Sequence, residues 1–356
     1  MPVSSRQQLI LLALLAFALL GLVAWSGNHW ARVWYHEQAA RRALEQRDFA
    51  TAAEQLRHCL RLQPGQANLL LLAAQTARRA GEFDRAEKLL QDAATAGEIP
   101  EIIALERRLQ RFQSGELTDA EAHWNFCREH PEHVSTPLIL EALIVGSLQV
   151  LQLDLARRGI ALWLEQRSSP IEQSQGLFWR GQLAVRQGNG EGALADYRLA
   201  LEKNPANEAA QRQAVEILVR YDAPEALRLL EPLLQKRPKD AALQLLLARC
   251  RRRLGEPESA RSLLDALLAD RPNEPQVLLE RGLVELDLGQ PAQAEPWLRR
   301  AIAVAPQMRD LNAALAQCLR LLGHPEAAEF EERTRRLDAD IQAKIDRVFG
   351  TSGGAK

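Results

Sequence analysis

The tetrapeptide Leu-Gly-x-Pro occurs three times at a constant spacing, as LGEP at 254–257, LGQP at 288–291 and LGHP at 322–325. A glycine tolerates the left-handed backbone conformation at the end of a helix, and a proline is well placed in the first turn of the next helix. The equal intervals between the three copies therefore predict a chain built from helix–turn–helix repeats of about 34 residues.

The same register extends through most of the chain. Counterparts of the turn glycine are Gly81, Gly115, Gly188, Gly255, Gly289 and Gly323. Five residues after the turn position stands a recurring alanine: Ala52, Ala86, Ala120, Ala193, Ala226, Ala260, Ala294 and Ala328. Prolines that can end a second helix close most repeats: Pro64, Pro131, Pro205, Pro238, Pro272 and Pro306. A small residue at a fixed position is expected where two helices cross closely.

The pattern resembles the tetratricopeptide repeat, a helix–turn–helix module of about 34 residues. That family has a small residue at its eighth position, as Gly181 and Gly282 stand here, and a large one at its twenty-fourth, as Trp124 and Tyr197 do. The resemblance implies an all-α fold, a right-handed α-solenoid of about nine repeats over residues 33–328. The repeats are expected to begin near Val33, Ala67, Glu101, Pro137, Ser174, Asn207, Ala241, Pro275 and Arg309.

The fourth repeat and the end of the array depart from the pattern. The fourth repeat has Leu151 where the turn glycine is expected, and it runs a few residues long. Residues 329–349 have the polarity of a helix that covers the last apolar face of a solenoid. We therefore expect a C-terminal capping helix at 329–349, followed by a flexible tail at 350–356.

The N-terminal region has a different character. Residues Leu9–Trp25 are 17 consecutive uncharged residues that would span about 25 Å as a helix, and Ser26–Trp30 extend them to the thickness of a bilayer core. We expect a short tail at 1–8 and a transmembrane helix at 9–30, with the repeat domain on the extracytoplasmic side. A cleaved signal peptide is the alternative, although Ala24-Trp25-Ser26 is a poor cleavage site.

Composition and motifs argue against catalysis and against nucleic-acid binding. The 45 basic and 46 acidic residues nearly cancel, whereas a protein that binds phosphates usually has a basic excess. The sequence has no phosphate-binding glycine loop, no HExxH motif and no nucleophile elbow. We therefore expect no enzyme activity, no cofactor and no small-molecule substrate.

The four cysteines are interpreted as core residues. The interval from Cys59 to Cys127 and the interval from Cys250 to Cys318 are both twice the repeat length, which places each pair at one position of alternate repeats. Partners two repeats apart along a stack of helices are too distant for a disulfide, which needs Cα atoms within about 7 Å.

A zinc site is one alternative use of a cysteine. Cys127 could share a helix face with His123 and His130. The second cysteine that tetrahedral sites usually have is missing, and Pro131 interrupts the helix, so we expect no metal site here.

Candidate binding residues come from the first-helix positions that line the concave face in tetratricopeptide solenoids. Arginine and glutamine there can bind acidic groups or the backbone of an extended peptide. The candidate partner-binding residues are Asn68, Gln75, Arg78, Arg79, Gln182, Arg186, Arg249, Arg252 and Arg253. An ordinary solvated face is the alternative. The family's lysine–asparagine clamp for a terminal carboxylate is absent, because the matching pairs are Leu71/Gln75, Phe178/Gln182 and Leu245/Arg249.

Apolar residues occupy the same kind of position in the third to fifth repeats. They are Ile102, Leu105, Leu109, Phe112, Leu138, Val145, Leu148 and Phe178. Exposed together, they would form a large apolar patch of the kind that marks a partner site. If the irregular fourth repeat shifts the register, they belong to the core instead. The sequence leaves both interpretations open.

Together these features predict a membrane-anchored, non-catalytic scaffold that binds protein or peptide partners on its concave surface. The resemblance brings an expectation of bacterial envelope assembly or secretion as the setting. Two alternatives remain open. One is an exported soluble repeat protein that regulates or accompanies an enzyme. The other is a glycan-binding protein that stacks sugars on Trp124, Trp163, Trp179 and Trp297.

Overall fold

The computed structural model describes the backbone of residues 29–350 and the side chains of residues 29–343. The predicted tail at 1–8 and nearly all of the predicted transmembrane helix at 9–30 lie outside these residues, as do residues 351–356 of the predicted C-terminal tail. Between residues 29 and 350, no helix combines the length and the apolar character that a membrane crossing requires.

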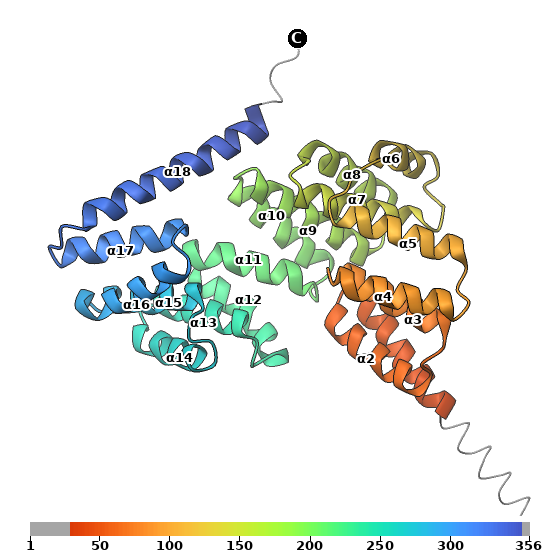
Figure 1. The fold of residues 1–356 in the computed structure, drawn as a ribbon, viewed down its shortest axis with the longest axis horizontal. Helices are drawn as coiled ribbons and strands as arrows, with labels where there is room; N and C mark the ends of the chain where they lie inside the picture. The colour runs from red at the N-terminus through yellow and green to blue at the C-terminus, as the bar shows by residue number, and fades with distance from the viewer. Residues whose placement is uncertain (1–28, 351–356) are drawn as a thin grey trace, which may run out of the picture. The chain divides into compact units, whose positions relative to one another are not determined.

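All regular structure in the described residues is helical, and it divides into two compact units (Figure 1). The N-terminal unit comprises residues 29–188 and 202–207, and the C-terminal unit comprises 189–201 and the residues from 208 onwards. The prediction of an all-α repeat fold is confirmed.

The helices of the N-terminal unit are the helical residues 29–45, α2 (Phe49–Leu62), α3 (Ala67–Arg79), α4 (Phe83–Thr95), α5 (Pro100–Gln113), α6 (Ala120–Glu129), α7 (Thr136–Gln149), α8 (Leu153–Gln166) and α9 (Pro170–Arg186). Those of the C-terminal unit begin with α10 (Gly190–Lys203) and continue with α11 (Glu208–Tyr221), α12 (Ala223–Lys236), α13 (Ala241–Arg253), α14 (Pro257–Asp270), α15 (Pro275–Asp287), α16 (Pro291–Val304), α17 (Arg309–Leu321) and α18 (Ala327–Gly350).

Helix starts follow from capping chemistry. The Asp48 carboxylate accepts a hydrogen bond from the backbone N–H of Thr51 at 3.1 Å and begins α2, and Asp240 caps α13 in the same way. Pro257 and Pro291 occupy the first turns of α14 and α16, where a missing N–H costs nothing. The proline of the first two Leu-Gly-x-Pro motifs therefore marks a helix start, as its position predicts.

Successive helices form pairs, and the pairs stack. In the N-terminal unit the first helices of neighbouring pairs contact one another, α3 with α5, α5 with α7 and α7 with α9. In the C-terminal unit α11 contacts α13, α13 contacts α15, and α15 contacts α17. We call these helices the first-helix layer of each unit. The second helices, such as α4 and α14, pack against the first helices on either side of them and form the second-helix layer.

The recurring alanines lie where the sequence predicts close helix crossings. Six of them are fully buried: Ala52, Ala86, Ala193, Ala226, Ala260 and Ala294. Ala120 is buried as well, while Ala328 in the terminal helix is exposed. The irregular fourth repeat also conforms, because the fully buried Ala156 stands five residues after Leu151.

The turn positions adopt the predicted left-handed conformation. Their φ angles lie between +68° and +97° at Gly81, Gly115, Gly188, Gly255, Gly289 and Gly323. Two other residues in the same register, Arg47 and Leu151, also have left-handed backbones, with φ of +59° and +60°. Arg47 and Leu151 therefore keep the backbone geometry of the glycine turns, which is strained for residues other than glycine. Tyr221, which precedes Ala226 by the same five residues, is instead the last residue of α11.

Helix α7 is the most buried helix of the N-terminal unit. Ten of its 14 residues are buried, and Gly146 lies so close to α5 that a Cβ atom added there would be 1.8 Å from the carbonyl oxygen of Phe112. The predicted apolar patch is part of this core, since four of its members are buried: Leu109, Phe112, Leu148 and Phe178. The other four are half-buried, so the interpretation as an exposed patch is wrong for this set.

Buried cysteines fill the core as predicted. All four are free, and burial raises the pKa of the Cys127 thiol to about 12 and those of the other three to about 11.

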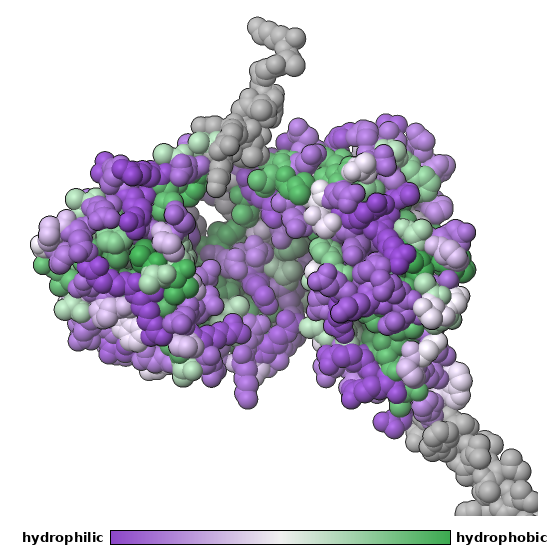
Figure 2. All heavy atoms as spheres, in the orientation of Figure 1, coloured by the Kyte–Doolittle hydropathy of each residue, from purple (hydrophilic) through white to green (hydrophobic). Residues whose placement is uncertain are grey.

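The surface of the protein is mainly polar, since polar side chains cover most of the face of each unit shown in Figure 2. Helix α18 packs on α17 and buries Phe330 in the core of the C-terminal unit.

We predict that Leu151→Gly stabilises the protein by about 1 kcal/mol, because it removes left-handed strain from a side chain that is 44% exposed and contributes little packing. The matched reverse change is Gly255→Ala, which places a Cβ on a left-handed backbone with no atom within 4 Å of it. It should destabilise by about the same amount. Urea denaturation of both variants measures the two shifts, and a Leu151→Gly midpoint at or below that of the wild type would contradict the prediction.

Candidate interaction surfaces

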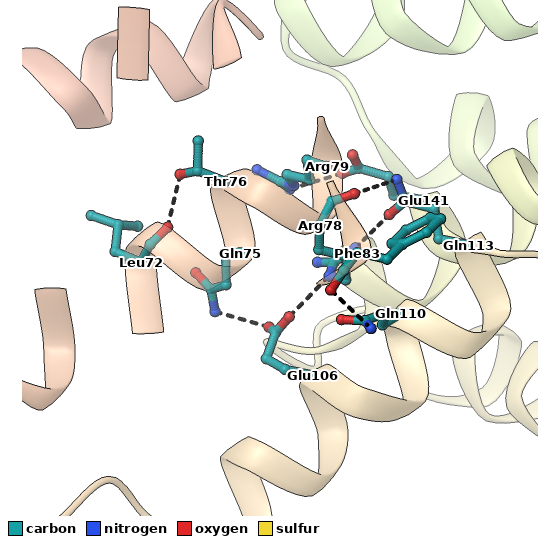
Figure 3. A network of polar contacts seen from close by, with 10 residues as sticks. All are labelled: Leu72, Gln75, Thr76, Arg78, Arg79, Phe83, Glu106, Gln110, Gln113 and Glu141. Atoms are coloured by element: carbon teal, nitrogen blue, oxygen red, sulfur yellow. Dashed lines mark hydrogen bonds and ion pairs between the residues drawn. The ribbon is translucent and has the colours of Figure 1, made fainter. Parts of the chain in front are cut away.

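A buried polar network joins the second and third repeats in the first-helix layer (Figure 3). Glu106 of α5 accepts hydrogen bonds from Gln75 Nε2 at 2.9 Å and from Arg78 Nε at 3.0 Å, both on α3. Arg78 Nη1 donates to Gln113 Oε1 at 2.9 Å, and Gln113 Nε2 returns a bond to the Arg78 carbonyl at 2.8 Å. Arg78 and Glu106 are each only 2% exposed, so the charge of one neutralises that of the other away from water.

The same network recurs in the C-terminal unit at equivalent positions. Glu280 of α15 accepts from Arg249 Nε at 2.8 Å and from Arg252 Nε at 3.1 Å, both on α13, and Arg252 Nη1 donates to Asp287 at 2.8 Å. The sequence separations of 31, 28 and 35 residues are identical in the two networks. A carboxylate of one repeat thus holds two side chains of the repeat before it, in both units.

Glu141 of α7 forms a second kind of buried ion pair. Its two oxygens accept from Arg47 Nη2 and from Arg79 Nη2, each at 2.8 Å. Figure 3 shows Arg79 directed at this carboxylate. Burial alone would raise the pKa of the Glu141 carboxyl, but the two guanidinium groups outweigh burial and lower that pKa to about 2.

Arg47 connects distant repeats of the N-terminal unit. It occupies the left-handed turn before α2, and its guanidinium lies over the rings of Phe49 and Trp179, at 5.2 and 5.4 Å from their centroids. Through Glu141 and Trp179 this one side chain links the first repeat to the fourth and the fifth. We call Arg47, Arg79 and Glu141 the Arg47 clasp.

The structure uses most of the predicted binding residues to hold the repeats together. Gln75, Arg78, Arg79, Arg249 and Arg252 all bind carboxylates of the same unit. Arg186 Nε donates to the Leu148 carbonyl at 2.7 Å, and Gln182 lies half-buried one turn before it on α9. Asn68 and Arg253, at the start of α3 and the end of α13, are exposed. The engaged candidate residues of α3 bind Glu106 and Glu141, and those of α13 bind Glu280 and Asp287.

Sequence reasoning missed the acidic partners. Glu106 and Glu280 lie on the first helix of the next repeat, and Glu141 lies on a first helix two repeats after that of Arg79. A useful signal is a glutamate 28 residues after an arginine of a first helix and 31 residues after another polar side chain, since both networks have this spacing. Arg47 carries a signal too, because it occupies a turn position where glycine is expected.

The contacts of the described residues support neither a zinc site at the histidines nor sugar stacking on the tryptophans. His123 Nε2 lies 3.2 Å from Arg108 Nη1, and the His123 ring packs edge-on against Phe112. Within the part of the chain that the structure describes, no three potential metal ligands gather. Trp163 and Trp179 are buried against each other, and Arg281 lies over the Trp297 ring at 5.0 Å.

The stacked helix pairs place the chain among the α-helical repeat proteins, a class that presents a surface assembled from many helices. Two family models, both described as tetratricopeptide repeat, match it: one over residues 43–109 and 220–280, the other over 171–208 and 279–342. The chain is a tetratricopeptide repeat protein. Proteins of this kind are generally protein-interaction scaffolds.

Solved structures with the same repeat resemble the chain at low sequence identity. A thermophilic tetratricopeptide repeat protein of Thermus thermophilus is 22% identical, with a TM-score of 0.42, and the match covers 49% of this chain and 98% of that one. A tetratricopeptide repeat protein from Parabacteroides merdae is 16% identical, with a TM-score of 0.41 and coverage of 81% and 99%. The C-terminal part of a repeat protein from Cytophaga hutchinsonii is 16% identical, with a TM-score of 0.45 and coverage of 68% and 98%. No curated protein matches the chain.

We predict that Glu141→Gln lowers the free energy of unfolding by about 3–5 kcal/mol near neutral pH, because it leaves two guanidinium groups without their buried counter-charge. The folded-state pKa of about 2 is below the ordinary value of 4.5, so the ionised carboxyl stabilises the fold above pH 4.5. That contribution is lost as pH falls from 4.5 towards 2.

Urea denaturation at a series of pH values measures this effect. The difference between the wild type and Glu141→Gln should shrink as pH falls through that window. Glu121→Gln, which removes an exposed partner of Arg158, is the control and should leave the urea midpoint almost unchanged. A difference that stays constant with pH would rule out the Arg47 clasp as the cause.

Proposed function

We propose that this chain is a membrane-anchored, non-catalytic scaffold that binds protein or peptide partners on the concave face formed by its first helices. One observation carries the proposal: in each unit the first helices contact one another directly, so their outward side chains form a continuous strip at repeated positions. A surface repeated in this way suits an extended segment of a partner. Assembly of envelope or secretion complexes is the setting we infer for it.

Because of the polar networks, only some residues of this face have groups left to bind a partner. Arg78 is buried and fully engaged by Glu106 and Gln113, so it supports the surface without contacting a partner. Arg79 and Arg249 are 21% and 25% exposed, and each uses only one nitrogen in the ion pairs of the described residues. Apart from the buried Arg79 Nε, their remaining N–H groups, with the exposed Arg253, can donate to a carboxylate or to a peptide carbonyl.

The exposed ends of the strip extend the proposed site. Asn68 is the second residue of α3, and its amide can both donate and accept a hydrogen bond. The half-buried Gln182 of α9 carries the same kind of amide, and Arg186 one turn later holds the Leu148 carbonyl. The proposed partner segment is an acidic or extended peptide, since the unused N–H groups of the arginines can bind a carboxylate, and the glutamine and asparagine side chains match backbone amides.

The membrane anchor at 9–30 rests on its length and its lack of charge. We predict that full-length protein stays in the membrane fraction after extraction with alkaline carbonate and with high salt, because a spanning helix is not released by either treatment. Fractionation followed by immunoblotting measures this. Protein released by carbonate, with a mature N-terminus at Gly27, would instead establish the exported soluble form that accompanies an enzyme.

We predict that Arg253→Glu combined with Asn68→Asp reduces partner capture several-fold, since the two changes place negative charge on the first-helix strip of each unit, where we propose that acidic segments bind. Proximity labelling from the full-length anchored chain, followed by mass spectrometry, gives the captured set. The control is Arg228→Glu combined with Asn189→Asp, which makes the same charge changes away from the first-helix layer, on the exposed Arg228 of α12 and in the turn before α10. Equal loss of the captured proteins in both double variants would contradict a binding role for the first-helix face.

A further inference from the structure

Exposed aromatic side chains gather at one end of the helix formed by residues 29–45, which is drawn in red in Figure 1 where the described chain begins. Trp30 and Trp34, one helical turn apart, are 60% and 64% exposed, and Tyr35 beside them is 64% exposed. The other tryptophans that the structure describes are buried or half-buried. A group of large aromatic side chains left in water usually marks a binding surface.

The opposite side of this helix is fixed in the core of the N-terminal unit. Val33 is 4% exposed and packs with Leu56 and Cys59 of α2, and the Cys59 thiol donates to the Val33 carbonyl at 3.6 Å. The Tyr35 ring packs edge-on against His36, with 5.5 Å between the ring centroids. The aromatic side chains therefore project from a packed helix, and the described chain has no earlier helix to cover them.

The sequence before this helix indicates a lipid bilayer as the surface that covers it. The uncharged run Leu9–Trp25 is separated from residue 29 by only three residues. The predicted spanning helix at 9–30 would be about 33 Å long, which fills a hydrocarbon core of about 30 Å. Trp34 and Tyr35 lie no more than about 8 Å beyond Trp30 along a helix, which keeps them within a headgroup layer of about 5–8 Å.

The charges of this segment also suit a bilayer surface. Residues 1–36 contain no aspartate and no glutamate. Arg32 is exposed and forms no ion pair with a described residue, so its guanidinium group can bind a lipid phosphate. The first acidic residue, Glu37, is already paired with Arg41 at 2.8 Å. An anionic membrane surface therefore meets no unpaired carboxylate at this end of the helix.

The residue types favour a bilayer interface over contact with a second helix. Tryptophan and tyrosine combine an apolar ring with a polar N–H or O–H, which suits a layer that is apolar on one side and hydrated on the other. Helix pairs instead pack mainly through leucine, isoleucine and valine. Between Trp30 and Tyr35 the aliphatic residues are Ala31 and Val33, and Val33 is already buried in the core.

We propose that Trp30, Trp34 and Tyr35 lie in the headgroup layer of a lipid bilayer and that Arg32 binds a lipid phosphate there. This inference rests on the membrane anchor proposed for residues 9–30 and adds a second membrane contact, which the folded repeat domain itself makes. The first repeat is then held directly on the membrane surface, so a partner of the first-helix face must bind close to the bilayer.

Fluorescence quenching in vesicles tests this placement. Full-length protein is reconstituted into vesicles of about three parts phosphatidylcholine to one part phosphatidylglycerol, an anionic lipid. Trp34→Cys introduces a thiol for a maleimide fluorophore. The four native cysteines are buried, and their thiol pKa values are raised to about 11 or 12, so they react poorly. Lipids with a nitroxide on the headgroup or in the middle of the acyl chain then report the depth of the fluorophore.

Val134→Cys, labelled in the same way, is the matched control. Val134 is an apolar residue of the same unit that is 81% exposed, so it reports nonspecific insertion of the fluorophore. We expect the headgroup nitroxide to quench the label of Trp34→Cys at least about threefold more strongly than that of Val134→Cys, because aromatic side chains concentrate at the headgroup level. The acyl-chain nitroxide should quench the Trp34→Cys label less than the headgroup nitroxide does.

Further changes in the Trp34→Cys background test which side chains hold the helix on the bilayer. Trp30→Ser combined with Tyr35→Ser removes the two remaining aromatic rings, and Arg32→Glu reverses the charge. All three side chains are exposed, so folding does not depend on them. Each of the two sets is expected to lower quenching by the headgroup nitroxide at least about twofold.

The possible results separate this contact from the anchor. Equal quenching at the two label positions, in protein that resists carbonate extraction, would overturn the inference and leave the anchor in place. Quenching that the serine and glutamate replacements leave unchanged would show that the anchor alone places residue 34 and would also overturn it. Release by carbonate would remove the anchor and this inference together. Disulfide-linked dimers of Trp34→Cys without quenching by either lipid would assign the aromatic face to a second copy of this chain.

Discussion

The close crossing of two helices at one small residue is the constraint on which every repeat depends. Ala86 and Ala260 are fully buried at these crossings, and so are Leu90 and Leu264 one turn later. In most repeats the chain leaves the turn through a left-handed residue, which sets the direction in which the second helix begins. Leu151 accepts that conformation at a cost of about 1–2 kcal/mol, so packing at the crossing outweighs the local preference of the side chain.

Charge provides a second level of order, which joins one repeat to the next. An arginine moved out of water needs a counter-charge and partners for its donors, and Arg78 finds both in Glu106 and Gln113. Because the partners come from the following repeat, each network fixes how neighbouring pairs stack. The sequence predicts that the candidate arginine and glutamine side chains of these networks face a binding partner. Because they are used inside the fold, a partner must bind at the exposed edges of the strip or on surfaces outside the first-helix layer.

The sequence predicted what a fixed spacing can encode: the helical repeat, the left-handed turns and the buried alanines and cysteines. It did not predict the ion pairs, because an arginine exposed on a surface strip and an arginine buried against the next repeat can occupy the same kind of position in the repeat. Arg78 and Arg253 illustrate the difference, since both occupied candidate binding positions while one is buried and the other exposed. Only the placement of Glu106 beside Arg78 separates the two, and that placement depends on how the repeats stack.

The largest departures from the repeat lie near one another, in α6, α7 and the turn before α8. Leucine or tyrosine fills the large position in most other repeats and is 1% exposed or less, whereas Trp124 of α6 is only half-buried there. Helix α7 departs in the opposite direction, since ten of its 14 residues are buried and Gly146 lies against the Phe112 carbonyl. The left-handed Leu151 nevertheless keeps the turn before α8 in the geometry of the glycine turns, and Ala156 is fully buried five residues later. The turn and the helix crossing are therefore preserved even where the sequence of a repeat departs most from the pattern.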